Sequence, residues 1–440
     1  MKKSFFKTFF LALTIIFFSG QVVLGQNTIK HVEYSISTNS LIRNLDDSID
    51  IVYNTFGRQS FMLVNRNSNY VLDAFLPNLG LVTDMEIVGK ELYFCGSYNG
   101  KPAIGRFELG SFFGGGGSAE IVQIDYFPIV EGITGSTALK KLEVQYLNQD
   151  DIHVYAIGLV TFGNPNWNIP DYTALFDCMY NGSVWDIEEI HSIDWVYRFY
   201  DLTVTNNYLY VVGEKFGGQG EYANAYSLPT IGNIHLLAPP YSLNMISVGT
   251  GVYYPISETL TESLIGNEFV TASYGYINGN TGVVISRYNN PYNLYARYLI
   301  PNVTASTRFI DLKYNDADKM LYLIPDKVNS VTTDMMYVFD LQYELARVFR
   351  TSFPYLCSVD RKATTTGSVV SGITTDGEVG IWGTAKPDNN CTFETPLSVN
   401  RYTHSLNFWQ SNASISYPIN TVLSALPRIS EYNLKHVCPR

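Results

Sequence analysis

FYDLTVTNNYLYVVGEKFGGQGEYANAYSL, residues 199–228, contains three short runs that are rich in aromatic and β-branched residues. The runs cover residues 200–205, 208–213 and 222–228, and their composition is typical of β-strands. An Asn-Asn pair separates the first two runs, and a glycine-rich segment separates the second pair. Both kinds of segment favour turns, so the stretch predicts three consecutive antiparallel strands.

Related stretches recur along the chain, each with an acidic residue ahead of a strand. Asp201 is followed eight residues later by LYVVG, and Asp84 is followed at the same distance by LYFCG. At Asp311 the turn is two residues longer, and Asp360 lies twelve residues before a glycine, as Asp84 and Asp201 do. Glu143 and Glu262 open looser copies. The sequence is therefore a repeat.

The spacing of the repeat selects a fold. Aligned on the second strand, the copies begin near residues 49, 92, 154, 209, 269, 321 and 368, in steps of 43 to 62 residues. Such a step fits one four-stranded antiparallel sheet and is too long for the shorter solenoid units. Sheets of this size bury their faces by stacking around an axis. We predict an all-β β-propeller of seven four-stranded blades, with six or eight blades as alternatives.

Composition agrees with this fold and limits the function. The 440 residues are 46% hydrophobic, 14% aromatic and only 16% charged, which suits a large core of twisted sheets. The formal net charge of −11 argues against nucleic acid as a partner, because phosphate binding needs a basic face. A cationic or neutral partner is electrostatically easier.

The two ends of the chain differ from the repeat. Residues 1–25 combine three lysines with a short apolar run, the pattern of a secretory signal peptide, and no later stretch in the mature chain is suited to cross a membrane. We expect a secreted protein whose propeller covers residues 26–397. The tail, residues 398–440, either adds a strand to the N-terminal blade, from residues 405–409 or 433–437, or caps one face.

The five cysteines form no CxxC pair, and with six scattered histidines a zinc site is not expected. Cys95 and Cys178 fall in predicted strands, where buried free thiols are the commoner case. Cys391–Cys438 and Cys357–Cys391 are the candidate disulfides, since export permits them. The sequence also has no GxSxG, HExxH or EF-hand motif, so it gives no catalytic residue.

The recurrent acids are the first candidate ligand-binding residues. They open the innermost strand of each blade, on the face where the inter-blade loops lie, and are expected to surround the channel mouth: Asp84, Asp201, Asp311 and Asp360, with Glu143 and Glu262 as looser counterparts. Convergent carboxylates would bind a cation such as calcium or a basic ligand. Alternatively, each acid accepts hydrogen bonds from local backbone N–H groups within its own blade, a structural role that we favour.

Aromatic residues in loops of the same face are the second set of candidates. Exposed rings stack on apolar ligand faces while nearby amides bind hydroxyl groups. This reasoning selects Trp167, Tyr172, Phe216, Tyr222, Tyr274 and Tyr276. Rim packing is the competing interpretation of these side chains.

With its signal peptide and its blade repeat, such as Asp201-Leu202 leading to LYVVG, the whole mature chain resembles secreted bacterial β-propeller proteins whose activity is not characterised. The resemblance implies the fold and no activity, because propellers host binding modules and enzymes alike. We expect a non-catalytic binding protein that recognises a glycan or a protein through one propeller face. The alternatives are a carbohydrate-active hydrolase or lyase with its site at the channel mouth, and a structural scaffold of the cell envelope.

Overall fold

The fold was analysed in a computed structural model of the chain. The described residues are 27–29, 40–54, 59–125, 133–162, 172–182, 184–192, 197–215, 221–228, 241–244, 253–255, 259–290, 293–301, 309–325, 327–328, 331–332, 335–351, 353–374, 379–383, 392–402, 407–410, 413–416 and 419–436. The expected signal peptide and the cysteines at 391 and 438 lie outside these ranges.

Consecutive antiparallel strands form four-stranded units, which we call blades and number in chain order. Blade one contains β2 (Ser40–Asp46), β3 (Ile49–Asn54), β4 (Ser60–Asn65) and β5 (Tyr70–Phe75). Blade two contains β6 (Leu79–Val88), β7 (Glu91–Tyr98), β8 (Lys101–Glu108) and β9 (Ala119–Asp125), with the short helix α2 (Leu109–Phe113) between the last two. Blade three contains β10 (Ile133–Asn148), β11 (Asp151–Phe162), β12 (Tyr172–Tyr180) and β13 (Trp185–Ser192).

The remaining blades follow the same order. Blade four contains β14 (Tyr197–Val204), β15 (Tyr208–Lys215), β16 (Glu221–Ser227) and β17 (Tyr241–Asn244). Blade five contains β18 (Tyr253–Pro255) and β19 (Leu260–Ser263), which both pair with β20 (Phe269–Ile277), followed by β21 (Asn280–Asn290) and β22 (Asn293–Pro301). Blade six contains β23 (Phe309–Asn315), β24 (Met320–Pro325), β27 (Met335–Asp340) and β28 (Leu345–Thr351), with the separate hairpin β25 (Lys327–Val328) and β26 (Val331–Thr332). Blade seven contains β29 (Tyr355–Arg361), β30 (Ser368–Ile373) and β31 (Val379–Gly383), completed by β1 (Asn27–Ile29).

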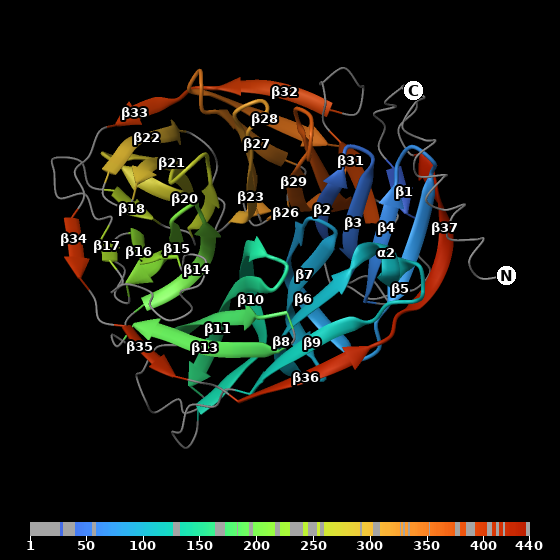
Figure 1. Cartoon of the computed structure of the whole chain (residues 1–440). Coiled ribbons are helices and arrows are strands. Elements are labelled where there is room, and N and C mark those ends of the chain that lie inside the picture. Colours follow the sequence, from blue (N-terminus) through green and yellow to red (C-terminus); the bar gives the residue numbers. More distant parts are fainter. Residues whose placement is uncertain are drawn as a thin grey trace.

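The blades stand around one axis, so the described part of the chain has the architecture of a β-propeller with seven such units (Figure 1). The predicted all-β propeller fold is confirmed. The two Asn-Gly turns have left-handed geometry, with φ values of 51° and 74° at Asn99 and Gly100 and of 50° and 88° at Asn278 and Gly279.

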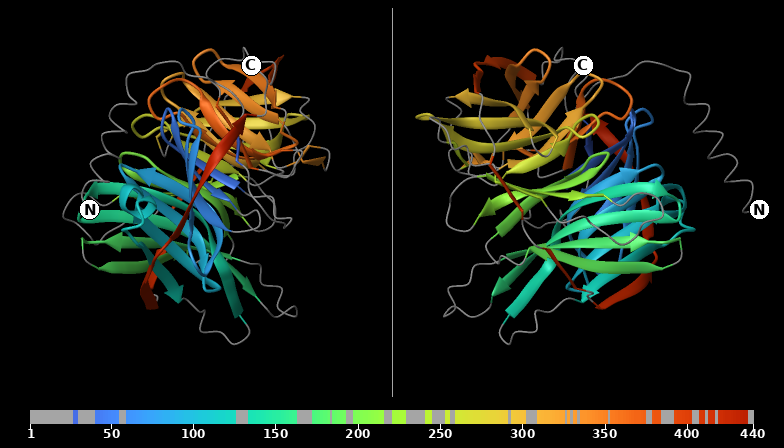
Figure 2. Two further views of the ribbon diagram at one scale, coloured as in Figure 1. Left: turned by 90° about the vertical axis from the view of Figure 1, so that its right-hand side faces the viewer. Right: turned by 60° about the vertical axis from the view of Figure 1, so that its left-hand side comes forward.

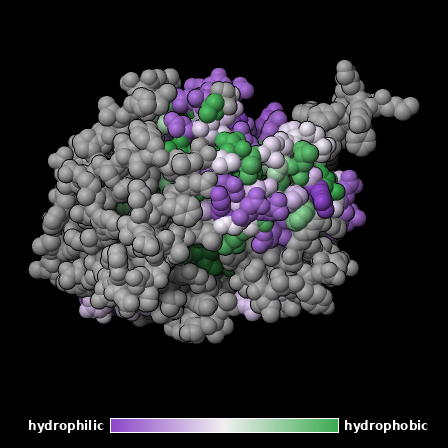
Figure 3. Space-filling view, turned by 90° about the horizontal axis from the view of Figure 1, so that it is seen from below, coloured by the Kyte–Doolittle hydropathy of each residue, from purple (hydrophilic) through white to green (hydrophobic). Residues whose placement is uncertain are grey.

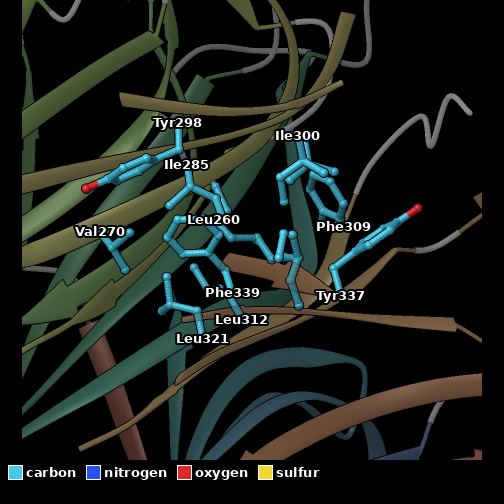
Figure 4. Packing of buried hydrophobic residues seen from close by; sticks show 14 of the residues in the cluster. Leu260, Val270, Ile285, Tyr298, Ile300, Phe309, Leu312, Leu321, Tyr337 and Phe339 are labelled. Carbon is cyan, nitrogen blue, oxygen red and sulfur yellow. The ribbon is translucent and has the colours of Figure 1, made fainter. Parts of the chain in front are cut away.

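Neighbouring blades bury their facing side chains against each other. Between blades five and six, for example, side chains from β19–β22 interlock with side chains from β23, β24 and β27 (Figure 4). Val270, Ile285 and Tyr298 come from blade five, and Leu321 and Phe339 come from blade six. Alternation along each strand supplies the apolar face that this packing requires.

The glycine that marks the repeat has a steric cause. In β6 the pairing register shifts between Val82 and Asp84, which is a β-bulge. The bulge brings the Leu81 carbonyl oxygen to 1.9 Å from the position that a Cβ atom on Gly96 would occupy, and Gly96 has a φ of 154°. In blade seven, Gly372 faces the Tyr355 carbonyl in the same way, at 2.4 Å. Only glycine fits there without displacing the backbone.

The final part of the chain runs around the outside of the ring and adds an outermost strand to each blade. We call these strands the belt: β32 (Thr392–Leu397), β33 (Asn400–Tyr402), β34 (Asn407–Gln410), β35 (Ala413–Ser416), β36 (Ile419–Ala425) and β37 (Arg428–His436). β32 pairs with blade six, and the following strands pair with blades five, four, three, two and one in that order. Figures 1 and 2 show this reverse course along the perimeter.

The belt also joins the ring where it closes. Residues 428–433 of β37 pair with β5 of blade one, and residues 434–436 pair with β1 in blade seven. β1 thus lies between β31 and β37, which links blades one and seven into one nine-stranded sheet. The assignment of residues 405–409 to the N-terminal blade is corrected, because β34 pairs with β17 of blade four.

Other observations concern cysteines and the surface. Cys95 and Cys178 are buried free thiols, and Cys357 is also buried. The candidate disulfide Cys357–Cys391 involves a cysteine that lies outside the described residues. Within the described ranges, no helix is long and apolar enough to span a membrane. On the side of the molecule where β36 lies, hydrophilic and hydrophobic residues are interspersed (Figure 3).

Candidate functional site

Three of the predicted acids occupy matching positions on the inner strands. Asp84 pairs with Cys95, Asp201 with Val212, and Asp311 with Ile324, each directly after a β-bulge. Each partner residue precedes the glycine or proline that ends the repeat motif. These acids form one level of the channel, which we call the first level.

Asp360 does not belong to this level. It pairs with Val369, whereas Ser358 pairs with Ser371 after the bulge and takes the first-level position of blade seven. The cause is the turn, because residues 362–367 separate the paired ends of β29 and β30, while only two residues separate those of β6 and β7. Asp360 is twelve residues before its glycine, as Asp84 is, but it does not occupy the same position on the inner strand. The prediction that Asp360 matches Asp84, Asp201 and Asp311 was therefore wrong.

A second level of ionisable side chains lies two residues further along the inner strands. Asp360 belongs to it together with Glu86, Glu143, Glu262 and Lys313, which face Val369, Tyr93, Tyr155, Val270 and Tyr322 across their hairpins. In blade three the first-level position is held by Lys141, which pairs with Ile157. Glu143 and Glu262 are thus neighbours of the first-level acids and not their equivalents.

The acids connect one blade to the next. The Leu142 N–H donates to Asp84 Oδ2 over 3.3 Å, and the Thr261 N–H donates to Asp201 Oδ2 over 2.9 Å. Further bonds of this kind run from Val144 to Glu86, from Val359 to Asp311 and from Asn44 to Asp360. The expected donors within the same blade are present for two acids, because the Met85 N–H donates to Asp84 Oδ1 over 2.9 Å and the Leu312 N–H donates to Asp311 Oδ1 over 3.1 Å. The donors on the inner strand of the following blade were not predicted.

Basic side chains lie between the carboxylates. Arg43 Nη2 is 2.7 Å from Asp84, and Arg43 Nη1 is 3.6 Å from Asp311. Lys141 Nζ is 4.0 Å from both Asp84 and Asp201, and Lys313 Nζ is 3.4 Å from Glu262. The channel therefore holds a mixed network of opposite charges. In the described residues, no group of three or more His, Cys, Asp or Glu side chains is arranged to hold a metal ion.

The network shifts several acid–base equilibria. Burial raises the pKa of Glu86 to about 7 and that of Asp201 to about 6. Burial also raises the pKa of Glu143 well above its usual value, and the adjacent Glu86 carboxylate adds to the effect. At Asp311 burial acts in the same direction, but nearby Arg43 and two lysines hold its pKa below the usual value.

A cavity of about 280 Å³ adjoins this second level. Its walls include Glu86, Glu143, Glu262, Asp360 and Lys313, and also Gly89 and Ala363 from the turns after β6 and β29. The cavity therefore lies toward the face that carries the turns between first and second strands, which we call the turn face. The site predicted on the opposite face, where the inter-blade loops lie, stays a prediction, because this cavity does not test it.

Of the predicted aromatic set, the structure describes the side chains of Tyr274 and Tyr276. Trp167 and Phe216 lie outside the described residues, and of Tyr172 and Tyr222 only the backbone is described, in β12 and β16. Tyr274 is buried in the core between blades five and six, so it is rim packing and not an exposed platform. Tyr276 is half-buried in β20.

Sequence reasoning missed Arg43, Glu86, Lys141 and Lys313. The signal was present as pairs of ionisable residues two positions apart on one inner strand, such as Asp84 with Glu86 and Asp311 with Lys313. Since strand side chains alternate, such pairs face the same side of the strand. The three basic residues were missed because only acidic residues were considered as candidates.

Comparisons with known proteins concern the fold. No protein-family model matches the chain, and no curated protein matches it. The chain is similar to the WD40 β-propeller domain of Doa1, with a TM-score of 0.47 and 10% identity over 82% of this chain and 98% of that one. It is similar to the same degree, with a TM-score of 0.47 and 10% identity, to the β-propeller domain of Myceliophteria thermophila Cps50 (Swd1), covering 82% and 100% of the two chains. Function has to be argued from the site.

Proposed function

We propose that the protein is a secreted, non-catalytic binding protein whose central cavity receives a basic group of a protein or an amino-containing glycan. The observation that carries the proposal is the composition of the cavity wall. Five carboxyl groups line it, from Asp84, Glu86, Glu143, Glu262 and Asp360, against three basic side chains. A protonated amine or guanidinium entering from the turn face would stabilise the ionised form of these carboxyl groups. Export is supported by the pattern of residues 1–25.

The second-level carboxylates give the binding a pH dependence. Burial raises the pKa of Glu86 to about 7 and that of Glu143 well above its usual value, which favours the protonated form of both groups. A cation beside them lowers their pKa and releases protons into solution. By linkage, the affinity for a basic group rises as the pH increases through about 7.

Calorimetric titration tests the proposal with two probes, a lysine- and arginine-rich peptide and a chitosan oligosaccharide. In buffers of different ionisation enthalpy, we expect proton release on binding and tighter binding at pH 8 than at pH 6. Glu143→Gln should weaken binding, whereas Glu431→Gln, an exposed residue on β37, should leave it unchanged. Binding that is independent of pH and of Glu143 would contradict the proposal.

A second candidate function rests on the presence of Glu86 and Glu143 in the wall of the same cavity. Glycoside hydrolysis uses a pair of carboxyl groups, of which one donates a proton while the other is ionised. The test measures the release of reducing ends from a panel of polysaccharides. Release by the unsubstituted protein that is lost in both Glu86→Gln and Glu143→Gln would establish glycoside hydrolysis in place of non-catalytic binding. Turnover that survives in either variant would exclude the pair as its source.

A further inference from the structure

A groove of about 640 Å³ lies on the turn face between blades five and six, apart from the central cavity. Leu264 and Ile265 from the β19–β20 turn, Tyr314 from β23 and Leu341 from the β27–β28 turn give it an apolar floor. This floor is continuous with the core shown in Figure 4, because Tyr314 and Leu341 belong to that core and Leu264 packs against it. A rigid core therefore supports the groove.

Tyr295 in β22 stands at the groove between two ion pairs. The Arg287 guanidinium lies 5.0 Å from the centre of its ring and the Arg401 guanidinium 5.5 Å. Arg287 is bound to Glu268 over 2.7 Å, and Arg401 to Glu344 over 2.8 Å. The Tyr295 residue nevertheless remains 48% exposed. The ring is thus positioned by its neighbours while still accessible to a ligand.

The polar groups of the groove are balanced in charge. Its walls contain two acids, Glu268 and Glu344, and two bases, Arg287 and Lys319, together with the amide of Gln342. An arginine has five N–H donors and a carboxylate about four acceptor sites, so ion pairs of this size leave hydrogen-bonding capacity unused. A ligand with many hydroxyl groups and no net charge matches such a surface, whereas a strongly charged ligand does not.

We propose that this groove binds a neutral saccharide. Aromatic and apolar side chains of the groove contact the C–H faces of the sugar, and the two ion pairs exchange hydrogen bonds with its hydroxyl groups. Strand addition by an extended peptide would use the outermost strands β33 and β32, which end the sheets of blades five and six, and not the side chains of the groove.

The test titrates the full protein with four neutral oligosaccharides, the cello-, xylo-, malto- and N-acetylchitohexaose. We expect at least one of them to bind at up to millimolar concentration, and Tyr295→Ala to weaken that binding at least tenfold. Tyr295→Phe retains the ring and should retain most of the affinity. Tyr146→Ala is the matched control, since Tyr146 lies in β10 of blade three and is 46% exposed.

Three results would overturn the proposal. These are the absence of binding to all four hexaoses, equal loss of binding in the Tyr146→Ala variant, and a saccharide affinity that Tyr295→Ala leaves unchanged. Thermal unfolding of each variant identifies loss of structure. If Tyr295→Ala does not fold, Gln342→Ala replaces it, because Gln342 is an exposed wall residue of the groove whose truncation should weaken binding without disturbing the core.

Discussion

The Arg43 guanidinium lies 2.7 Å from the Asp84 carboxylate, although the two residues belong to the inner strands of neighbouring blades. Arg43 also approaches Asp311 of blade six, so one side chain connects three blades across the channel. Its pKa is raised, because the surrounding carboxylates outweigh its burial. Ionic contacts of the channel therefore contribute to the cohesion of the ring as well as to the cavity.

Arg43→Ala should lower the free energy of unfolding by about 3–5 kcal/mol, because it leaves Asp84 and Asp311 buried without their main cationic partner. Chemical denaturation measures the change. As a comparison, Asp316→Ala removes one side of an exposed ion pair with Lys319 and should cost less than about 1 kcal/mol. Equal effects of the two substitutions would show that the channel network contributes no more than a surface pair.

The second-level carboxylates predict a loss of stability on raising the pH. The folded pKa of Glu86, about 7, lies above its unfolded value, so the folded state holds more protons between these two values. Stability from this group is therefore fully present below the unfolded pKa and is lost as the pH rises through about 7. The melting temperature of Glu86→Gln should fall less between about pH 5.5 and about pH 8 than that of the unsubstituted protein. A parallel fall in both proteins would contradict this assignment.

Gly96→Ala should destabilise the protein by more than about 2 kcal/mol, because the added Cβ would collide with the Leu81 carbonyl of the bulge. Gly372→Ala should behave similarly, since the Tyr355 carbonyl occupies the same place in blade seven. Gly116→Ala is the control, as nothing lies within 4 Å of its added Cβ. The denaturation midpoints of the three variants measure these changes in stability. A midpoint of Gly96→Ala equal to that of Gly116→Ala would show that the bulge can relax.

Truncation after residue 426 removes β37 and should loosen the joint between blades one and seven, because β37 pairs with both. Hydrogen exchange should show at least about tenfold lower protection in β5, with little change in β27 of blade six. Truncation after residue 436 retains β37 and should preserve the protection of β5. Unchanged exchange in the shorter protein would mean that the joint holds without the belt.

The sequence predicted those parts of the fold that are encoded within one hairpin. The recurring glycine and the Asn-Gly turns depend on neighbouring residues, and the first-level acids Asp84, Asp201 and Asp311 follow from them. Asp360 was misplaced because a longer turn changed the register without changing the spacing. The belt could not be predicted, since β33 pairs with β22, a strand about a hundred residues earlier, and no local pattern encodes such a pairing.

The reverse course of the belt has a consequence for how the chain folds. During synthesis, the strands of blade one are available first, yet β37 joins them last, after the earlier belt strands have followed blades six to two. The contact of Asn27 with His436 spans nearly the whole described chain, and contacts between such distant residues form slowly. In the nascent chain, β37 is therefore absent from the junction between blades one and seven until the belt strands have paired around the ring. The pairing of β37 with β5 and β1 is the step that closes the ring.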